Sequence, residues 1–238
     1  MKILSIGNSF SQDAHNLLHT IAEQNGKDIQ TVNLCIGGCS LKTHHHNLVN
    51  NLENHFLERN GGEGERRIGI REALKMDDFD VVTLQQVSEL GGIFDSFFPY
   101  VTVLTEEIRA AQPNAKLYLH QTWGYEIDSG HPGFDNYDRD QKKMFLSIKE
   151  TCLKVADLIN AAIIPTGDTI QYLRENVKEF DYKNGGLSLC RDSFHLSLDY
   201  GRYAAAVTWY YTLTGEKPKV YPLNDMSPQL MQKIVDSL

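Results

Sequence analysis

Residues 1–11 read Met-Lys-Ile-Leu-Ser-Ile-Gly-Asn-Ser-Phe-Ser, and this stretch carries the pattern that decides the fold. The apolar run that ends at Ile6 predicts a short buried strand, and a helical pattern follows over Asp13–Gln24. In an open α/β sheet, ligands bind where a strand ends and the next helix begins. Ser9 stands at this junction, where a serine can act as a nucleophile if a base reaches it.

The same alternation of strand and helix continues along the chain. Short β-rich runs separated by longer helical patterns predict parallel strands joined by right-handed crossovers. Most of the strands are almost uninterrupted apolar runs, as expected when helices cover both faces of the sheet. The expected strands are Ile3–Ile6, Ile29–Leu34, Val81–Leu84, Leu117–His120 and Ala162–Ile164. The expected helices are Asp13–Gln24, Leu41–Leu57, Pro99–Ala111, Arg139–Ala161, Thr169–Val177 and Leu198–Thr214, with a short last helix after Pro228.

The composition is that of an ordinary globular protein. Of the 238 residues, 41% are hydrophobic and 23% are charged, which is enough to form a sizeable core. The net charge of −8 argues against binding to nucleic acid, which needs clusters of Lys and Arg. No apolar stretch approaches the roughly 18 residues that span a membrane. Neither glycine-rich loop flanks a change in composition, so residues 1–238 are expected to form a single domain, of a size that leaves the oligomeric state open.

The number and spacing of the cysteines indicate the cellular compartment in which the protein is expected. Four scattered cysteines suggest no disulfide framework, and Cys35 and Cys39 lack the second pair that would complete a zinc site. Free cysteines favour a cytoplasmic protein. No secretory signal is visible after Met1, and a secreted or periplasmic location is expected only if a signal peptide ahead of it has been removed.

A second chemically informative stretch, Asp192-Ser193-Phe194-His195, stands just before the last long helix. Residues three apart in a helical turn lie on the same side, so Asp192 can accept the Nδ1 proton of His195 and leave Nε2 as a base. The order Ser9, Asp192, His195 is one that convergent triads use. Each piece alone has a simpler interpretation, since a serine or an aspartate before a helix is often only its cap.

A nucleophile also needs donors for an oxyanion. The paired glycines Gly37-Gly38 follow the second strand and can offer unobstructed backbone N–H groups, although they also suit a plain tight turn. Gln85-Gln86 follow the third strand and can offer a side-chain amide, although either can equally be a polar strand end.

These blocks together resemble the SGNH (GDSL-type) hydrolases. Their details, Gly-Asn-Ser-Phe-Ser, Ile-Gly-Gly-Cys-Ser-Leu, Thr-Leu-Gln-Gln and Asp-Ser-Phe-His-Leu-Ser, are more similar to the branch called DUF4886, a domain of unknown function. The resemblance covers nearly the whole chain and preserves the order of the blocks. It implies a three-layer α/β/α sandwich of flavodoxin-like type, with a central, mostly parallel five-stranded sheet. It also implies hydrolysis of an ester, often an acetyl group on a carbohydrate.

The resemblance assigns roles residue by residue. Ser9 matches the nucleophile, and its backbone N–H matches one oxyanion donor. Gly38 matches the glycine of the second block, whose N–H is another donor. Asp192 and His195 match the acid and the base of the final block.

The chain departs from the family at two positions. Asn8 replaces the usual aspartate before the serine, which we expect to affect local hydrogen bonding rather than the nucleophile. The third block lacks the family's Gly-x-Asn-Asp, so Gln85, with Gln86 as the alternative, would supply the missing amide. Side chains alternate along a strand, so only one glutamine should face the site. If neither does, the oxyanion hole has only backbone donors.

Other candidates are weaker. Trp123 and Tyr125 follow the fourth strand and either form a wall that stacks on a sugar or are ordinary half-buried aromatics. The consecutive histidines His44–His46 point in different directions on a helix, which favours solvated surface over a metal site. Cys39 lies near the proposed site without an acid–base partner, so we do not assign it as a nucleophile. No metal and no organic cofactor are expected.

The sequence therefore predicts a serine esterase that removes a small acyl group, such as O-acetyl, from a carbohydrate or related metabolite. Two functions of other classes stay open. The first is a flavodoxin-like protein that binds phosphate or FMN at the loop after the first strand, since hydroxyls and helix N–H groups suit an anion. The second is a carbohydrate-binding module without catalysis.

Overall fold

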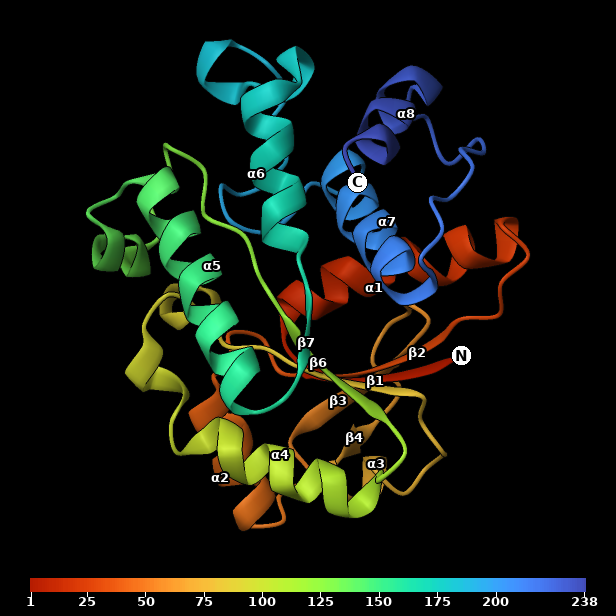
Figure 1. Ribbon diagram of the computed structural model, residues 1–238, viewed down its shortest axis with the longest axis vertical. Coiled ribbons are helices and arrows are strands. Elements are labelled where there is room, and N and C mark those ends of the chain that lie inside the picture. The colour runs from red at the N-terminus through yellow and green to blue at the C-terminus, as the bar shows by residue number, and fades with distance from the viewer.

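The computed structural model describes residues 1–238, and a mostly parallel sheet runs through its centre (Figure 1). The strand order is β4-β3-β2-β1-β5-β6-β7. The five parallel strands are β1 (Lys2–Gly7), β2 (Gln30–Cys35), β5 (Val81–Leu84), β6 (Lys116–His120) and β7 (Ala162–Ile164). All five lie where the sequence predicts strands, with ends that differ by at most one residue.

The sheet is wider than the five strands expected. β3 (His55–Arg59) pairs antiparallel with β2, and β4 (Arg67–Ile68) pairs antiparallel with β3. The predicted helix Leu41–Leu57 is therefore wrong in its second half, because α2 (Leu41–Val49) ends at its C-cap Asn50. Asn51 then takes a positive φ of 52°, and the chain returns to pair along the free edge of β2.

Helices cover both faces of the sheet, as the sequence predicts. They are α1 (Ser9–Gln24), α2, α3 (Ile70–Ala73), α4 (Tyr100–Ala111), α5 (Gln141–Leu158), α6 (Thr166–Asn176), α7 (Tyr200–Thr214) and α8 (Pro228–Asp236). The short 3₁₀ turns are η1 (Ser88–Leu90), η2 (Phe94–Phe97), η3 (Pro132–Tyr137), η4 (Lys178–Phe180) and η5 (Tyr182–Asn184). Figure 1 shows α1 and α7 on one side of the sheet and α2, α3 and α4 on the other, which confirms the three-layer sandwich. None of the helices combines the length and the apolarity needed to cross a bilayer.

The position of β1 explains why a site forms after it. β1 pairs with β2 on one side and with β5 on the other, so the chain leaves the centre of the sheet first in one direction and then in the other. A crevice forms outside the carboxyl ends of the strands at such a switch point. Ser9 is the first residue of α1 and lies at this point.

The start of α1 is fixed by its cap. Asn8 Oδ1 accepts the N–H of Phe10 at 2.9 Å, and Ser11 Oγ accepts the N–H of Asn8 at 3.1 Å. Such a reciprocal cap stabilises a helix start by about 1 kcal/mol. Gly7 is required here, because a Cβ on it would lie 2.2 Å from Ser11 Oγ. The local sequence therefore holds Ser9 in the first turn of the helix.

Candidate active site

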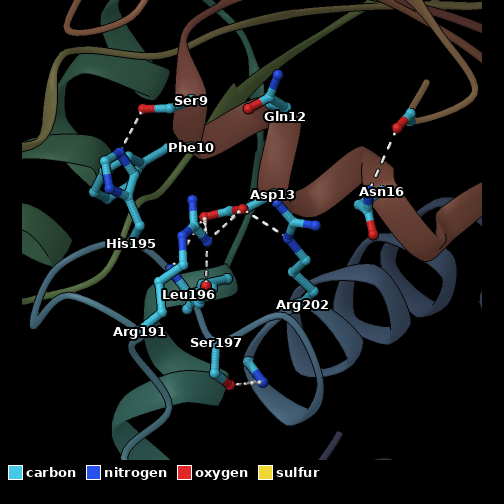
Figure 2. A network of polar contacts seen from close by, with 12 residues as sticks. Ser9, Phe10, Gln12, Asp13, Asn16, Arg191, His195, Leu196, Ser197 and Arg202 are labelled. Atoms are coloured by element: carbon cyan, nitrogen blue, oxygen red, sulfur yellow. Dashed lines mark hydrogen bonds and ion pairs between the residues drawn. The ribbon is translucent and has the colours of Figure 1, made fainter. Parts of the chain in front are cut away.

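Ser9, His195 and Asp192 are connected in a line by two hydrogen bonds. His195 Nε2 lies 2.8 Å from Ser9 Oγ, and Figure 2 shows this contact between α1 and the segment before α7. His195 Nδ1 lies 2.7 Å from Asp192 Oδ2. The sequence predicts these three residues as a group, and the structure brings them together from segments 186 residues apart. The arrangement has the hydrogen bonds of a serine–histidine–aspartate triad.

The segment that carries Asp192 and His195 is a tight turn and not the helical turn assumed from its spacing. Arg191 N–H donates to the carbonyl of His195 at 2.9 Å, and Ser193 has a left-handed φ of 69°. Asp192 Oδ1 accepts the backbone N–H of His195 at 2.7 Å, so each carboxylate oxygen has its own partner. The turn thus fixes Asp192 against both the backbone and the ring of His195.

The charge state of Asp192 suits this arrangement. Partial burial raises the pKa of its carboxyl, but the hydrogen bonds from the His195 ring and backbone and from the N–H of Phe194 together hold the pKa below its ordinary value of 3.8. Asp192 is therefore ionised at neutral pH. A carboxylate at Nδ1 keeps the proton on that nitrogen and leaves Nε2 of His195 free to accept one from Ser9.

The site is open at the surface. Ser9 is half-buried, the side chain of His195 is 21% exposed and that of Asp192 is 41% exposed. The imidazole of His195 lies between two phenyl rings, with centroids 4.2 Å from Phe194 and 5.7 Å from Phe10. These rings pack against the imidazole of His195, and Ser9 remains partly exposed.

The glycine turn after β2 is joined to the cap of α1. Gly38 is exposed and has a φ of 64°, which favours glycine. Asn8 Nδ2 donates to the carbonyl of the next residue, Cys39, at 3.1 Å. The residue that precedes the serine therefore ties the Gly38 turn to the start of α1. No intrahelical partner exists for the Ser9 N–H, because the first N–H groups of a helix have none.

The two glutamines after β5 have different surroundings. Gln86 is fully engaged, since its amide donates to the carbonyl and hydroxyl of Ser96 and its oxygen accepts the N–H groups of Leu41 and Val87. Gln85 Nε2 donates to Asn8 Oδ1 at 2.6 Å, which leaves its second N–H hydrogen without a protein partner. The side chain of Gln85 thus points to Asn8, the cap residue beside Ser9, whereas that of Gln86 points to Ser96 in η2.

His120 fixes the orientation of the Gln85 amide, a role that the sequence analysis missed. Its Nδ1 lies 3.0 Å from Gln85 Oε1, and its Nε2 lies 2.9 Å from the hydroxyl of Thr166. Burial lowers the pKa of His120 to about 3, so the ring is neutral and one nitrogen donates while the other accepts. A donor at Nδ1 turns the oxygen of Gln85 to His120 and its nitrogen to Asn8. The sequence signal that could have revealed this role is the position of His120 as the last residue of β6, at the carboxyl end of a parallel strand.

The sequence matches the family described as Domain of unknown function (DUF4886) over residues 2–229. The chain belongs to the DUF4886 family. A crystal structure of a DUF4886 protein from Bacteroides uniformis ATCC 8492 is similar at 35% identity with a TM-score of 0.92, covering 100% of this chain and 92% of that one. No functionally curated protein matches the chain.

More distant structures share the fold of this DUF4886 protein. A proposed SGNH hydrolase from Slackia heliotrinireducens is 21% identical with a TM-score of 0.59, covering 90% of this chain and 98% of that one. Axe2, an acetylxylan esterase from Geobacillus stearothermophilus, is 13% identical with a TM-score of 0.54, covering 90% and 94%. At these identities the likeness shows the fold, and the fold implied by the SGNH resemblance is confirmed.

The prediction that Trp123 and Tyr125 form a wall that stacks on a sugar is wrong. Trp123 and Tyr125 are both 0% exposed in the DUF4886 protein, so neither ring can contact a sugar. Trp123 stacks on Phe10 at 4.2 Å and donates its Nε1–H to the carbonyl of Phe194 at 2.8 Å. Trp123 therefore packs against the residue after Ser9 and the residue before His195, and Tyr125 packs against Phe194 with their centroids 5.7 Å apart. The half-buried ring that contacts His195 is that of Phe194, and the half-buried ring of His131 packs against Phe194 with their centroids 5.0 Å apart.

The histidine run is only partly solvated. His46 is exposed, whereas His44 is fully buried with its Nδ1 3.0 Å from His55 Nε2. The expectation of solvated surface is therefore wrong for His44, because α2 packs that side against the sheet. No group of three or more His, Cys, Asp or Glu side chains is arranged to hold a metal ion. Burial raises the pKa of Cys39 to about 12, which keeps it a neutral thiol.

Proposed function

We propose that this DUF4886 protein is a serine esterase in which Ser9 is the nucleophile, His195 the general base and Asp192 the residue that orients the base. One observation carries the proposal: Ser9 Oγ, His195 Nε2, His195 Nδ1 and Asp192 Oδ2 form an unbroken chain, with contacts of 2.8 and 2.7 Å. A flavin- or phosphate-binding loop would need the position of Ser9 but would give no role to the His195–Asp192 pair.

The reaction follows from these contacts. His195 Nε2 takes the hydroxyl proton as Ser9 Oγ attacks the ester carbonyl carbon, and the carbonyl π-bond electrons move to its oxygen. The tetrahedral intermediate collapses, the C–O bond to the alcohol breaks, and His195 gives its proton to the departing alkoxide. Water then attacks the acyl-enzyme with His195 again as base, and Ser9 and the free acid are released. Asp192 stabilises the imidazolium in both steps.

Three N–H groups are proposed to hold the oxyanion: the backbone N–H of Ser9, the backbone N–H of Gly38 and the second N–H of the Gln85 amide. The first is supported by its place at the start of the 16-residue α1, where orphan N–H groups and the helix dipole favour negative charge. The second and third are supported by their hydrogen-bonded link to Asn8. Removal of one such donor typically lowers kcat by about 10²- to 10³-fold.

A small acyl group on a carbohydrate is the substrate class that we favour. The acetylxylan esterase Axe2 shares the fold, and the open triad is compatible with a bulky leaving group. Phe194 and His131 replace Trp123 and Tyr125 as the aromatic rings that a sugar can meet. Aromatic faces of this kind suit the apolar faces of sugar rings.

The experiment is active-site labelling with a fluorophosphonate followed by peptide mapping, together with hydrolysis of p-nitrophenyl acetate and a panel of acetylated sugars. Ser9→Ala is expected to remain folded and to lose both labelling and turnover. Ser147→Ala is the matched control, because Ser147 is also a half-buried serine on a helix, α5. Labelling of any residue other than Ser9, or full activity of Ser9→Ala, contradicts the proposal.

A further inference from the structure

A buried carboxylate lies one helical turn from the serine. Asp13 is 0% exposed and follows Ser9 by four residues on α1, so both side chains project from the same face of the helix. Its carboxylate accepts Arg191 Nη1 at 2.9 and 3.1 Å, Arg202 Nε at 2.8 Å and the backbone N–H of Leu196 at 3.0 Å (Figure 2). We call these four residues the Asp13 clamp.

The Asp13 clamp binds both ends of the turn that carries Asp192 and His195. Arg191 directly precedes Asp192, and Leu196 directly follows His195. The guanidinium of Arg191 also donates to the carbonyl of Leu196, which closes the turn across its base. Both ends of the turn are therefore attached to one carboxylate, and that carboxylate belongs to the helix that carries Ser9.

The turn needs such an attachment. Residues 191–196 contain no helix or paired strand, except for the isolated bridge between Cys190 and Leu196. Asp192 itself is exposed and bonds only within the turn, so its contacts orient His195 but do not place the turn relative to α1. The backbone N–H of Glu126 and the Nε1–H of Trp123 attach the turn to the segment after β6, and the contacts with Asp13 attach it to α1. Because Ser9 and Asp13 share a rigid helix, a fixed distance from Asp13 to the turn fixes the distance from His195 to Ser9.

The charged residues of the Asp13 clamp are better suited to fixing the position of the turn than to raising the free energy of unfolding. A buried carboxylate with two guanidinium partners is costly to desolvate, and apolar replacements of such clusters often leave proteins equally stable. The ions fix the relative positions of the groups that they join, because a guanidinium donates in a fixed plane and a carboxylate accepts several donors at once. Arg202, in the first turn of α7, donates to the same carboxylate, and Figure 2 shows Arg191 and Arg202 on either side of Asp13.

We propose that Asp13 and Arg191 are positioning residues that hold His195 at hydrogen-bonding distance from Ser9. This inference rests on the proposed function, since it gives the clamp a task in the same triad. Displacement of a catalytic group by about 1 Å can lower a rate by about 10²-fold. Loss of the clamp should therefore slow the activation of Ser9 and leave the binding of the ester largely unchanged.

The test compares Arg191→Gln with Arg71→Gln. Arg71 is a matched control: it pairs with Glu107 at 2.8 Å, has a similarly half-exposed side chain and lies on α3, away from the turn. For p-nitrophenyl acetate, Arg191→Gln is expected to lower kcat by about 10- to 100-fold, with KM within about twofold, and to slow fluorophosphonate labelling equally. Arg71→Gln is expected to keep wild-type rates. Equal rates for the folded Arg191→Gln variant and the wild type overturn the inference.

A purely structural role is separated by rescue and by a spectroscopic signature. Arg191→Lys keeps the positive charge and one donating nitrogen, so it should recover part of the lost kcat. A role in folding alone would change the melting temperature without this recovery of kcat. The downfield proton resonance of the His195–Asp192 hydrogen bond should broaden in Arg191→Gln and not in Arg71→Gln. Should Arg191→Gln fail to fold, Arg191→Lys and Asp13→Asn carry the same comparison. A wild-type protein that is never labelled at Ser9 refutes the proposed function instead, so the two failures are distinguishable.

Discussion

Acid should destabilise this protein steeply between pH 7 and pH 5, because four histidines are buried in the neutral form. Burial lowers the pKa of His15, His44 and His120 to about 3 and that of His55 to about 4, whereas the ordinary value is 6.5. For a group whose folded pKa is lowered, stability is present above the unfolded pKa and is lost as the pH falls towards the folded one. Glu58 acts in the opposite sense, since burial raises its pKa, and it offsets a small part of the loss.

The magnitude follows from linkage. Each histidine takes up a proton in the unfolded chain but not in the folded one over this range, which costs about 2 kcal/mol between pH 7 and pH 5. Four such groups approach about 8 kcal/mol, which is comparable to the whole free energy of unfolding of a typical domain. The protein is therefore expected to lose most of its stability by about pH 5.

Urea unfolding followed by the fluorescence of the two buried tryptophans, Trp123 and Trp209, measures this loss. His15→Gln should reduce the slope of stability against pH by about 1.4 kcal/mol per pH unit near pH 5. His46→Gln is the control, because His46 is exposed and should leave the slope unchanged. A free energy of unfolding that stays flat from pH 7 to pH 5, or equal slopes in the two variants, would refute the reasoning.

Two further predictions concern the surroundings of the triad. Gln85→Met should lower kcat by about 10²- to 10³-fold if its amide holds the oxyanion, whereas Gln86→Met should cost stability and leave kcat within a few-fold; comparable kcat losses in steady-state kinetics of the two variants would count against the assignment. Phe194→Ala should raise KM for acetylated sugars severalfold, whereas Trp123→Phe should leave KM unchanged and lower the free energy of unfolding by about 1 kcal/mol, through loss of its hydrogen bond to the Phe194 carbonyl. A raised KM in Trp123→Phe alone would reverse these roles.

The parts of the site that local sequence encodes were predictable. Each parallel strand is a short apolar run, Ser9 follows the first of them, and the Asp192–His195 turn stands shortly before the long helix α7. The order of the blocks was enough to predict that they meet, because parallel strands bring their carboxyl ends to one edge of the sheet. The reason given for the Asp192–His195 contact was nevertheless wrong, since the turn is closed by backbone bonds and a left-handed Ser193 instead of a helical repeat.

The parts that depend on tertiary contacts were not predictable. The predicted helix Leu41–Leu57 included His55–Leu57, but these residues belong to β3, which pairs with the free edge of β2. Trp123 and Tyr125 follow a strand at the correct edge, yet their exposure depends on what the later turn at Phe194 covers. The Asp13 clamp joins residues nearly two hundred positions apart, and no local signal marks a buried carboxylate as the partner of a distant arginine.

The central claim is that His195 activates Ser9, and the rate of a single covalent reaction tests it most directly. Intact-protein mass spectrometry after treatment with a fluorophosphonate should show one adduct, which peptide mapping places on Ser9. The labelling rate should fall by about 10³-fold or more in His195→Ala and labelling should be absent in Ser9→Ala, as for triads whose members act as a unit. A His195→Ala variant that is labelled at the wild-type rate would contradict the account.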